Sequence, residues 1–326
     1  IAFNPPMSVQ RWTVPTAPSR FNLHEKMSYN EISKKLRLLV GLVLVSTGVK
    51  AQLPDTDIFL VGFKQDQDKF TFDNPVNITN RKGYDNQPSF IPGTSTLLYV
   101  RIPDSGSADI RQYELSGKDV AITDSPESEY SPSYSHNMQF LSMVRVDLDS
   151  GQRFYRLPTA HHDISIPRPE PGTDSIGYYC WMNDSMLAMF ILGPANTLQV
   201  LNLRTHQRTL IASDIGRCMR MNPDRSELYF VVKANELEWK ILAMNAKTYA
   251  TRELFPTLAG SEDYTVLSDG SLLMGSKGKL YRRKLNSGSE WTEIADFSKS
   301  IGDFYRIVVN SASDRLALVG FTGTRP

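Results

Sequence analysis

Cysteine is scarce in this sequence. Only two of its 326 residues, Cys180 and Cys218, are cysteines, which is too few for a disulfide framework to hold the fold. The chain must therefore be held together by burial of apolar side chains. For the two cysteines the sequence leaves two alternatives open, a disulfide or a pair of buried free thiols.

An excess of charge of either sign is also lacking. Lysine and arginine number 36 and aspartate and glutamate 35, so the formal net charge is +1. No overall field attracts nucleic acid or an anionic membrane, and we expect no nucleic-acid partner. With 40% hydrophobic and 22% charged residues, the composition is that of a globular chain with a sizeable core.

Hydrophobic runs are too short to cross a bilayer, which requires about 20 apolar residues, so we expect no membrane span. The apolar segment at 38–45 follows three basic residues and precedes small residues at Val49 and Ala51. This order is typical of a secretory signal peptide over residues 27–51, with Gln52 first after cleavage. A buried N-terminal helix is the alternative interpretation.

The residues before this segment carry no folding pattern. Residues 1–26 begin at Ile1, are rich in proline and show no periodicity, so we expect an upstream or disordered leader. No cysteine follows the expected cleavage site, and no lipid anchor is therefore predicted. Residues 52–326 are expected to form a single domain that works as a monomer in the periplasm or as a secreted protein.

Catalytic and metal-binding motifs are lacking. The sequence has five histidines, no Gly-x-Ser-x-Gly elbow and no His-Glu-x-x-His pair. We therefore predict no catalytic residue, no metal and no cofactor.

Two segments resemble metal-binding patterns, and we interpret both as turns or loops. Asp147-Leu-Asp149-Ser-Gly151 imitates the start of a calcium loop, but Pro158 stands where the loop needs a glutamate ligand. We interpret this segment as a hairpin turn. In His161-His162-Asp163, neighbouring side chains of an extended segment point to opposite faces, which favours a solvated loop.

What the sequence does contain is an internal repeat. Each copy has an apolar anchor, a polar turn rich in Asn, Asp, Pro, Ser and Gly, and a short apolar run. The successive anchors are 44, 47, 40, 46 and 42 residues apart, which suits one four-stranded β-propeller blade per repeat. The six anchors are Phe90, Tyr134, Trp181, Met221, Leu267 and Val309.

Further strand-like runs follow the copies. The predicted third strands are 110–115, 154–157, 198–203, 239–244 and 279–285, and the predicted fourth strands include 120–123 and 209–212. The sixth copy lacks these runs, and residues 57–62 and 76–79 have the pattern of the missing strands. The predicted fold is therefore all-β, a six-bladed β-propeller of four-stranded antiparallel blades, with N-terminal strands closing the ring on the C-terminal blade.

The turns of the repeat carry a family resemblance. The segments 87–93 and 131–137 resemble the Pro-x-Trp-Ser-Pro-Asp-Gly signature of TolB-like, WD40-like propeller repeats, also called PD40 repeats. Met221-Asn-Pro-Asp224 carries the Pro-Asp turn and Leu267-Ser-Asp-Gly270 the Asp-Gly turn. The resemblance covers most of residues 57–321 and implies protein binding across the propeller face. Members of this family such as TolB have an N-terminal α/β domain before the propeller, and we expect no such domain in residues 52–326.

Polar and aromatic residues recur at the start of each repeat, three or four positions before the anchor. If these positions enter the innermost strands, they surround one mouth of a central channel. Tyrosine and arginine there are typical of protein interfaces, although these residues could equally start strands and pair with neighbouring loops. The predicted binding set is Asn86, Tyr130, Tyr178, Arg217, Asp263, Tyr264, Tyr305 and Arg306.

Two functions remain open from the sequence. The first is a non-catalytic scaffold at the cell envelope that binds a protein or an envelope polymer through the channel mouth. The alternative is a glycan-processing hydrolase or lyase whose site is assembled from scattered loops. Two convergent carboxylates about 5 to 10 Å apart in a deep pocket favour the enzyme, whereas a shallow funnel rich in tyrosine favours binding.

Overall fold

Strands and their connecting turns make up the described part of the chain. The structure, a computed structural model, describes residues 53–103, 106–159, 168–235, 238–285 and 288–322. These ranges contain 24 strands and no helix, in agreement with the all-β prediction. Within them there is accordingly no helix long and apolar enough to cross a membrane.

Three antiparallel sheets have four strands each, and in each sheet the strands follow one another in chain order. Their strands are β11 (Ile176–Asn183), β12 (Met186–Ile191), β13 (Thr197–Asn202), β14 (Arg208–Ser213), β15 (Ile215–Met221), β16 (Glu227–Lys233), β17 (Trp239–Asn245), β18 (Thr251–Pro256), β19 (Tyr264–Val266), β20 (Leu272–Ser276), β21 (Lys279–Arg283) and β22 (Thr292–Asp296).

A fourth sheet has three strands, β8 (Ser128–Tyr134), β9 (Phe140–Val146) and β10 (Gln152–Pro158). Residues after the undescribed range 160–167 bond to β10. The amide of Glu170 donates to the Phe154 carbonyl at 2.9 Å, and the Phe154 amide donates to Thr173 Oγ1 at 3.1 Å. The chain therefore returns along β10 on the side where the other sheets have a fourth strand.

The remaining nine strands form one extended sheet in the order β23-β24-β1-β4-β5-β6-β7, with β2 and β3 also paired to β1. A single parallel residue pair, Thr56 with Tyr84, joins its two halves. Its strands are β1 (Thr56–Asp66), β2 (Lys69–Phe72), β3 (Val76–Asn77), β4 (Tyr84–Phe90), β5 (Leu97–Ile102), β6 (Asp109–Tyr113), β7 (Asp119–Ala121), β23 (Phe304–Val309) and β24 (Arg315–Phe321).

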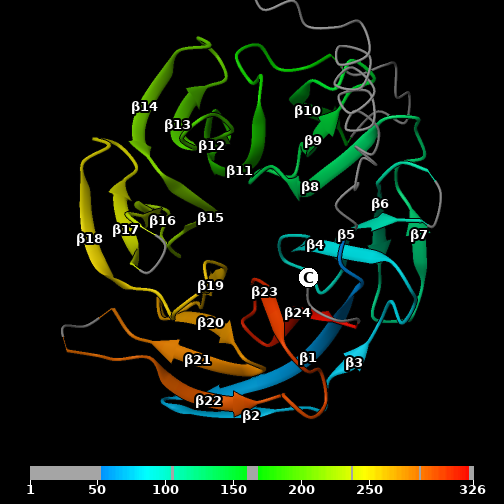
Figure 1. Cartoon of the computed structure of the whole chain (residues 1–326), viewed down its shortest axis with the longest axis vertical. Helices are drawn as coiled ribbons and strands as arrows, with labels where there is room; N and C mark the ends of the chain where they lie inside the picture. The colour runs from blue at the N-terminus through cyan, green and yellow to red at the C-terminus, as the bar shows by residue number, and fades with distance from the viewer. Residues whose placement is uncertain (1–52, 104–105, 160–167, 236–237, 286–287, 323–326) are drawn as a thin grey trace, which may run out of the picture. The chain divides into compact units, whose positions relative to one another are not determined.

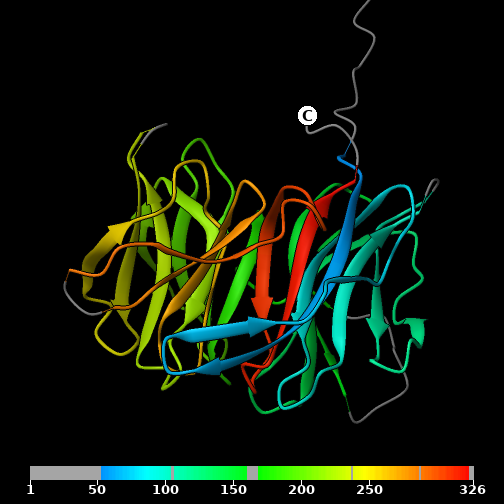
Figure 2. The ribbon, with the colours of Figure 1, turned by 90° about the horizontal axis from the view of Figure 1, so that it is seen from below.

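The first described strand pairs with the last. β1 runs antiparallel to β24, from Thr56 opposite Phe321 to Gly62 opposite Arg315, and Figure 2 shows the two strands side by side. β3 covers part of the other edge of β1. The predicted pairing of an N-terminal strand with the C-terminal repeat is thereby confirmed for these strands.

The first strands of neighbouring sheets contact one another. β4 contacts β8, β11 contacts β15, β15 contacts β19, β19 contacts β23 and β23 contacts β4, while β11 contacts β9 and β10. In Figure 1 these first strands lie toward the middle of the view, and the last strands β7, β14, β18 and β22 lie toward the rim. All six predicted anchors fall in a first strand or directly after one.

Burial is greatest in the second strand and least in the outermost strand of these sheets. The second strands β12, β16 and β24 are apolar and buried over most of their length, because each has a strand on both edges and side chains packed on both faces. The outer strands β14, β18 and β22 are largely exposed. The short apolar runs of the repeat therefore mark the second strands.

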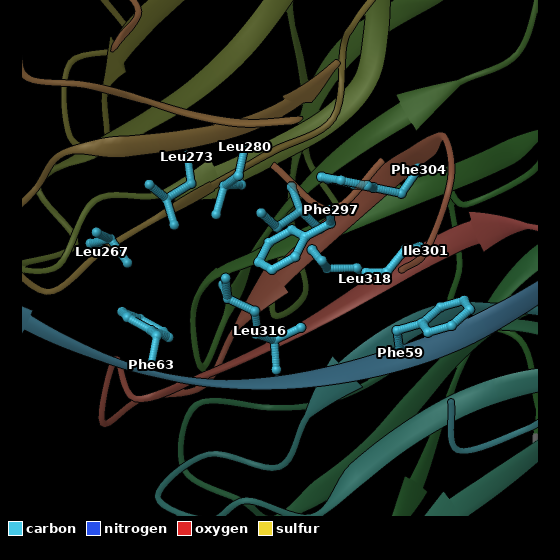
Figure 3. Close-up of a cluster of buried hydrophobic side chains, with 12 residues drawn as sticks. Phe59, Phe63, Leu267, Leu273, Leu280, Phe297, Ile301, Phe304, Leu316 and Leu318 are labelled. Atoms are coloured by element: carbon cyan, nitrogen blue, oxygen red, sulfur yellow. The ribbon is translucent and has the colours of Figure 1, made fainter. Parts of the chain in front are cut away.

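The hydrophobic core lies between neighbouring sheets. Figure 3 shows one cluster, in which Phe63 of β1 and Leu316 of β24 face Leu273 of β20. Its packing is tight at Gly275, where an added Cβ would lie 2.4 Å from the ring of Phe304. Only a residue without a side chain permits this approach between β20 and β23.

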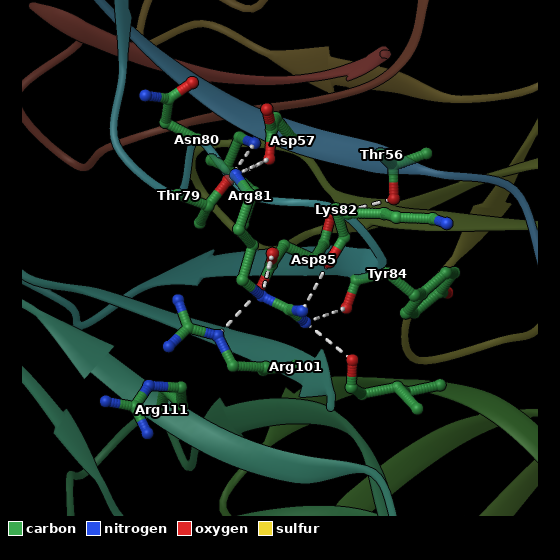
Figure 4. Close-up of polar contacts among 12 residues, drawn as sticks. Thr56, Asp57, Thr79, Asn80, Arg81, Lys82, Tyr84, Asp85, Arg101 and Arg111 are labelled. Carbon is green, nitrogen blue, oxygen red and sulfur yellow. Dashed lines mark hydrogen bonds and ion pairs between the residues drawn. The ribbon is translucent and has the colours of Figure 1, made fainter. Parts of the chain in front are cut away.

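A polar network holds the junction between β1 and β4. Asp85, which is completely buried, accepts from Arg101 Nε at 2.9 Å and pairs with Arg81 Nε at 2.8 Å (Figure 4). Thr56 Oγ1 donates to the Asp85 carbonyl at 3.0 Å. Nearby, the buried Asp57 accepts from Thr79 Oγ1 at 2.9 Å. Ion pairs and hydrogen bonds therefore hold the junction between the two halves of the nine-stranded sheet, although Arg81 Nε and Asp85 Oδ2 meet at ion-pair distance without hydrogen-bond geometry.

The segments interpreted as turns have different outcomes. Residues 147–151 connect β9 to β10, with Gly151 donating to Asp149 Oδ1 at 2.8 Å, so the hairpin interpretation is confirmed. The His161-His162-Asp163 loop, the leader at 1–26 and the signal segment at 27–51 lie outside the described residues.

Candidate functional site

Irregular pairing recurs in the first strands at the positions predicted to form the site. The strand register shifts between Asn86 and Ser89 in β4 and between Tyr130 and Ser133 in β8. Similar shifts occur in β11, β15 and β23. A bulge bends its strand and re-aims the side chains around it, so the local structure decides which side chains enter the space between the first strands.

Gln87 and Ser131 occupy equivalent bulges in neighbouring sheets, and each has a φ of 53°. Both residues precede a proline, and this left-handed conformation is unusual for a residue with a side chain. Gln87 Oε1 accepts from the Ser131 amide at 2.6 Å and from its hydroxyl at 3.2 Å. The side chain of one bulge therefore fixes the backbone of the next.

An ion-paired group joins β15 to the segment that precedes β19. Arg217 Nη1 pairs with Glu262 Oε1 at 2.8 Å, and its other terminal nitrogen pairs with Asp263. Burial disfavours both charges, but their attraction outweighs it, so the pKa of Arg217 stays above and that of Asp263 below its ordinary value. Lys233 Nζ adds a contact of 2.9 Å to Glu262. Both carboxylates are thus already engaged.

Two predicted tyrosines contact the arginine of β23. Arg306 Nη2 donates to the Tyr178 hydroxyl at 2.9 Å, and its guanidinium carbon lies 5.3 Å from the centre of that ring. Tyr305 accepts from Asn86 Nδ2 and stacks on Phe321 at 4.8 Å. These contacts tie both β4 and β11 to β23.

A cavity of about 330 Å³ lies between the first strands. Its lining comes from β4, β8, β11, β15 and β23, together with Asp263 immediately before β19. It includes tyrosine, tryptophan, serine and arginine side chains. We call this space the first cavity. Its lining residues at the turns after the first strands are Pro92, His136 and Arg225.

A second cavity of about 420 Å³ is lined by loops that precede the first strands, by turn residues and by Tyr305. Arg217 and Asp263 line both cavities. Their ion pair therefore lies at the boundary between the two spaces.

The predicted binding residues divide between these places. Tyr178 and Arg306 line the first cavity, and Tyr305 lines the second. Asn86 is completely buried, and Tyr130 packs against the hydrophobic cluster around Trp181. Neither of these two residues lines either cavity.

Tyr264 lies in the core, because its side chain is completely buried in the cluster around Tyr229 and Cys218. A side chain with no exposed surface offers nothing for a partner to contact in this structure, and this holds for Asn86 as well as for Tyr264. Its strand β19 shows no register shift against β20, unlike the other first strands. Equivalent repeat positions therefore differ in local register, so repeat position alone does not fix the direction of the side chain.

Several lining residues were missed from the sequence. Arg220 of β15, Arg225 of the following turn and Tyr134 of β8 line the first cavity but were not predicted as site residues. Arg225 lies in the turn after the anchor Met221, whereas Tyr134 is itself an anchor and Arg220 directly precedes one, so the anchors and their turns are the signal that finds them. The predicted set looked only at the opposite ends of the same strands.

Cys180 and Cys218 also line the first cavity, and both are free thiols. Burial raises the pKa of both, and that of Cys218 rises to about 11, so neither is an activated thiolate at neutral pH. Across the described ranges no group of three metal-ligating side chains gathers in one place.

Comparison with known proteins identifies the fold. No protein-family model and no curated protein sequence matches this chain. TolB from Acinetobacter baumannii matches with a TM-score of 0.52 and 11% identity, over 89% of this chain and 68% of that one. A putative TolB from Agrobacterium tumefaciens matches with a TM-score of 0.61 and 9% identity, over 82% and 99%.

A gluconolactonase from Xanthomonas campestris has a similar structure too, with a TM-score of 0.55 and 10% identity, over 85% of this chain and 94% of that one. At such low identity these likenesses establish the fold and leave activity open. The chain therefore has an all-β fold of the β-propeller type, which it shares with TolB-like proteins.

Proposed function

We propose that this protein is an exported, non-catalytic scaffold that binds a protein at the cell envelope through the mouth of a propeller channel. In this proposal residues 1–26 and 27–51 are a leader and a signal peptide, and residues 52–326 form one six-bladed domain. The protein works in the periplasm or is secreted. The second candidate is a glycan-processing hydrolase or lyase, and the structural likeness of this chain to a gluconolactonase keeps an enzymatic function open.

Contacts among the first strands support a closed ring. Contacts run without a break from β8 through β4, β23, β19 and β15 to β11. Residues from all six repeats line the first cavity. The β1 pairing to β24 removes a free sheet edge that would otherwise invite aggregation. These are the features expected when the six repeats surround a channel.

The observation that carries the binding proposal is the lining of the first cavity. It combines Tyr134, Tyr178 and Trp181 with several arginines, the residue types that dominate protein interfaces. Among the described residues that line it, Asp263 is the one carboxylate. Glycosidases need two, and the acid partner needs a raised pKa. Arg217 holds the pKa of Asp263 low instead, which favours binding over hydrolysis in the first cavity.

A site-specific photo-crosslinker tests this proposal. Placed at the exposed His136, on the rim of the first cavity, it should form a protein adduct in cells that export the chain. The matched control places the same group at Leu210, which is 65% exposed on the outer strand β14. Adducts that form equally at both positions, or at neither, would refute binding at this mouth.

Export is tested separately by N-terminal sequencing of the protein from fractionated cells. Cleavage that leaves Gln52 first, in the periplasmic or extracellular fraction, is the expected result. An uncleaved chain in the cytoplasmic fraction would overturn the localisation. The crosslinking experiment at His136 would still test binding at the first cavity independently of this result.

A further inference from the structure

Arginines outnumber carboxylates in the lining of the first cavity. Arg217, Arg220, Arg225 and Arg306 line it, together with Asp263. Arg217 is paired with Asp263 and with Glu262. As far as the structure describes the chain, the other three arginines form no ion pair at all. The cavity therefore carries positive charge that the protein does not neutralise by direct contact.

Arg225 has a structural role. Its Nε donates to the Met182 carbonyl at 3.2 Å, and its Nη2 donates to the carbonyls of Trp181 and Met182 at 2.5 and 3.0 Å. These bonds fasten the turn after β15 to the end of β11. The donors of Arg225 are thus largely used, and the residue contributes its charge rather than free hydrogen-bond donors.

Arg220 and Arg306 are bonded far less completely. Arg220 Nη1 donates to the Met219 carbonyl at 3.0 Å, and Arg306 Nη2 donates to the Tyr178 hydroxyl at 2.9 Å. The Nε atom of each is buried and finds no acceptor in the described ranges. A guanidinium has five N–H donors and must be charged, so both side chains keep unused donors beside the cavity.

Unused charged donors in a buried place need an explanation. Leaving the charged donors of a partly buried guanidinium without acceptors destabilises the folded state, and a water or an ion can complete such an unsatisfied group. Asp263 does not complete them, because Arg217 already pairs with it. An anion that enters the cavity would supply the missing acceptors for Arg220 and Arg306.

We propose that the first cavity binds a small molecule that carries carboxylate or phosphate groups, with Arg220 and Arg306 as the donors to its oxygens. A volume of about 330 Å³ lies within the range of about 300 to 1,000 Å³ usual for small-molecule sites. The rings of Tyr134 and Trp181 supply apolar surface for the rest of the ligand. This site does not depend on a protein partner.

Arginine suits this role better than lysine would. Its planar guanidinium meets two oxygens of a carboxylate or phosphate at once and stays charged at every physiological pH. The Tyr178 hydroxyl, which already accepts from Arg306, orients that guanidinium. Tyr178 is therefore a positioning residue for the anion.

The test uses the complete chain and two probes, citrate for carboxylates and inorganic phosphate for phosphates. Each is titrated calorimetrically at constant ionic strength, with chloride as the control anion. At least one probe should bind saturably with a stoichiometry of one and should raise the unfolding temperature as its concentration rises. The better probe identifies the anion class, and the absence of saturable binding for both overturns the proposal.

Two substitutions locate the site. Arg220→Gln and Arg306→Gln should each weaken binding of the active probe about tenfold or more. The matched control is Arg252→Gln, which removes an arginine paired with Glu227 on the exposed strand β18 and should leave affinity unchanged. Equal affinity in the wild type and both cavity variants would show that the anion binds elsewhere and would overturn the assignment.

Arg306→Lys provides a further check if one glutamine variant fails to fold. It keeps the charge but loses the planar fork, so affinity should fall between that of the wild type and the glutamine variant. Unchanged affinity would contradict the role of Arg306. Because neither probe is a protein, a negative result here leaves the crosslinking test at His136 intact.

Discussion

Two groups of arginines in this molecule occupy comparable depths but have opposite surroundings. At the junction of β1 and β4, Arg81 and Arg101 both bond to the buried carboxylate of Asp85. In the first cavity, Arg220 and Arg306 have no carboxylate partner within the described ranges. The difference indicates that the junction arginines stabilise the fold, whereas the cavity arginines are placed for something that is not part of the chain.

Arg217 provides the intermediate case. It lines the first cavity like Arg220 and Arg306, yet it is paired as completely as the junction arginines, with Glu262 and Asp263. Its position between the two cavities therefore combines a structural ion pair with a place at the site. Stability measurements on single variants distinguish the junction arginines, Arg217 and the cavity arginines Arg220 and Arg306.

The largest expected effect is at the junction. Burial raises the pKa of Asp85, which offsets part of its attraction to the two arginines. Asp85→Asn nevertheless leaves two partly exposed guanidiniums without the anion that they share, so unfolding should become easier by about 3 kcal/mol. Urea denaturation measures the change. The control Asp119→Asn removes a carboxylate that is 25% exposed and also pairs with Arg101, and it should cost about 1 kcal/mol or less. Equal losses in both variants would contradict a special role for the buried junction.

The next largest effect is expected at Arg217. Arg217→Gln leaves Asp263 buried without its partner, so we expect a loss of about 2 kcal/mol. Glu262 retains Lys233 at 2.9 Å, which limits the damage. Chemical denaturation of the variant beside Arg252→Gln measures the difference. If Arg217→Gln loses no more unfolding free energy than Arg252→Gln, the ion pair of Arg217 does not stabilise the fold, and Arg217 resembles the unpaired arginines Arg220 and Arg306.

A pH-dependent effect is expected at Glu129. Burial raises the pKa of this carboxyl, and Oε2 finds no bonding partner in the described part of the chain. The folded state therefore keeps the proton to a higher pH than the unfolded chain, and stability falls as pH rises from the ordinary glutamate pKa through the raised one. Glu129→Gln should remove that decline and add about 1 kcal/mol at neutral pH.

Denaturation series across pH, run in parallel on the wild type and Glu129→Gln, measure this effect. The two proteins should converge at low pH, where Glu129 is protonated in both states. A wild type that gains stability with rising pH relative to the variant would show that Glu129 is stabilised as an anion.

The smallest effect is expected at Arg220. Arg220→Gln removes a charge without a carboxylate partner, so in the absence of any added anion it should leave stability unchanged or raise it by up to about 1 kcal/mol. Thermal unfolding in a buffer without multivalent anions measures it. A loss as large as that of Arg217→Gln would mean that Arg220 stabilises the fold, and the contrast between the two groups would fail.

Much of the fold was predictable because repeated strands carry a repeated pattern. The anchors Phe90, Tyr134, Trp181, Met221 and Val309 all fall in first strands, and the predicted third strands lie at β6, β10, β13, β17 and β21 within a few residues. The pairing of β1 with β24 was anticipated as well. Apolar runs must be buried wherever they occur, so their spacing alone indicates the strands.

The site was predicted less well. Arg217, Asp263, Tyr178 and Arg306 do line the first cavity, but Tyr264, at the equivalent repeat position of β19, is completely buried. Repeat position does not determine direction, because the register shifts differ from strand to strand.

By itself the amino-acid sequence determined that the chain is all-β, that its repeats are about one blade long and that no local catalytic motif is present. These properties follow from short-range patterns of apolar and polar residues. Only the tertiary structure decided which arginines are neutralised, because Arg217 and Asp263 are 46 residues apart in the chain. Charge balance within a cavity depends on distances between strands, and a sequence contains no such distances.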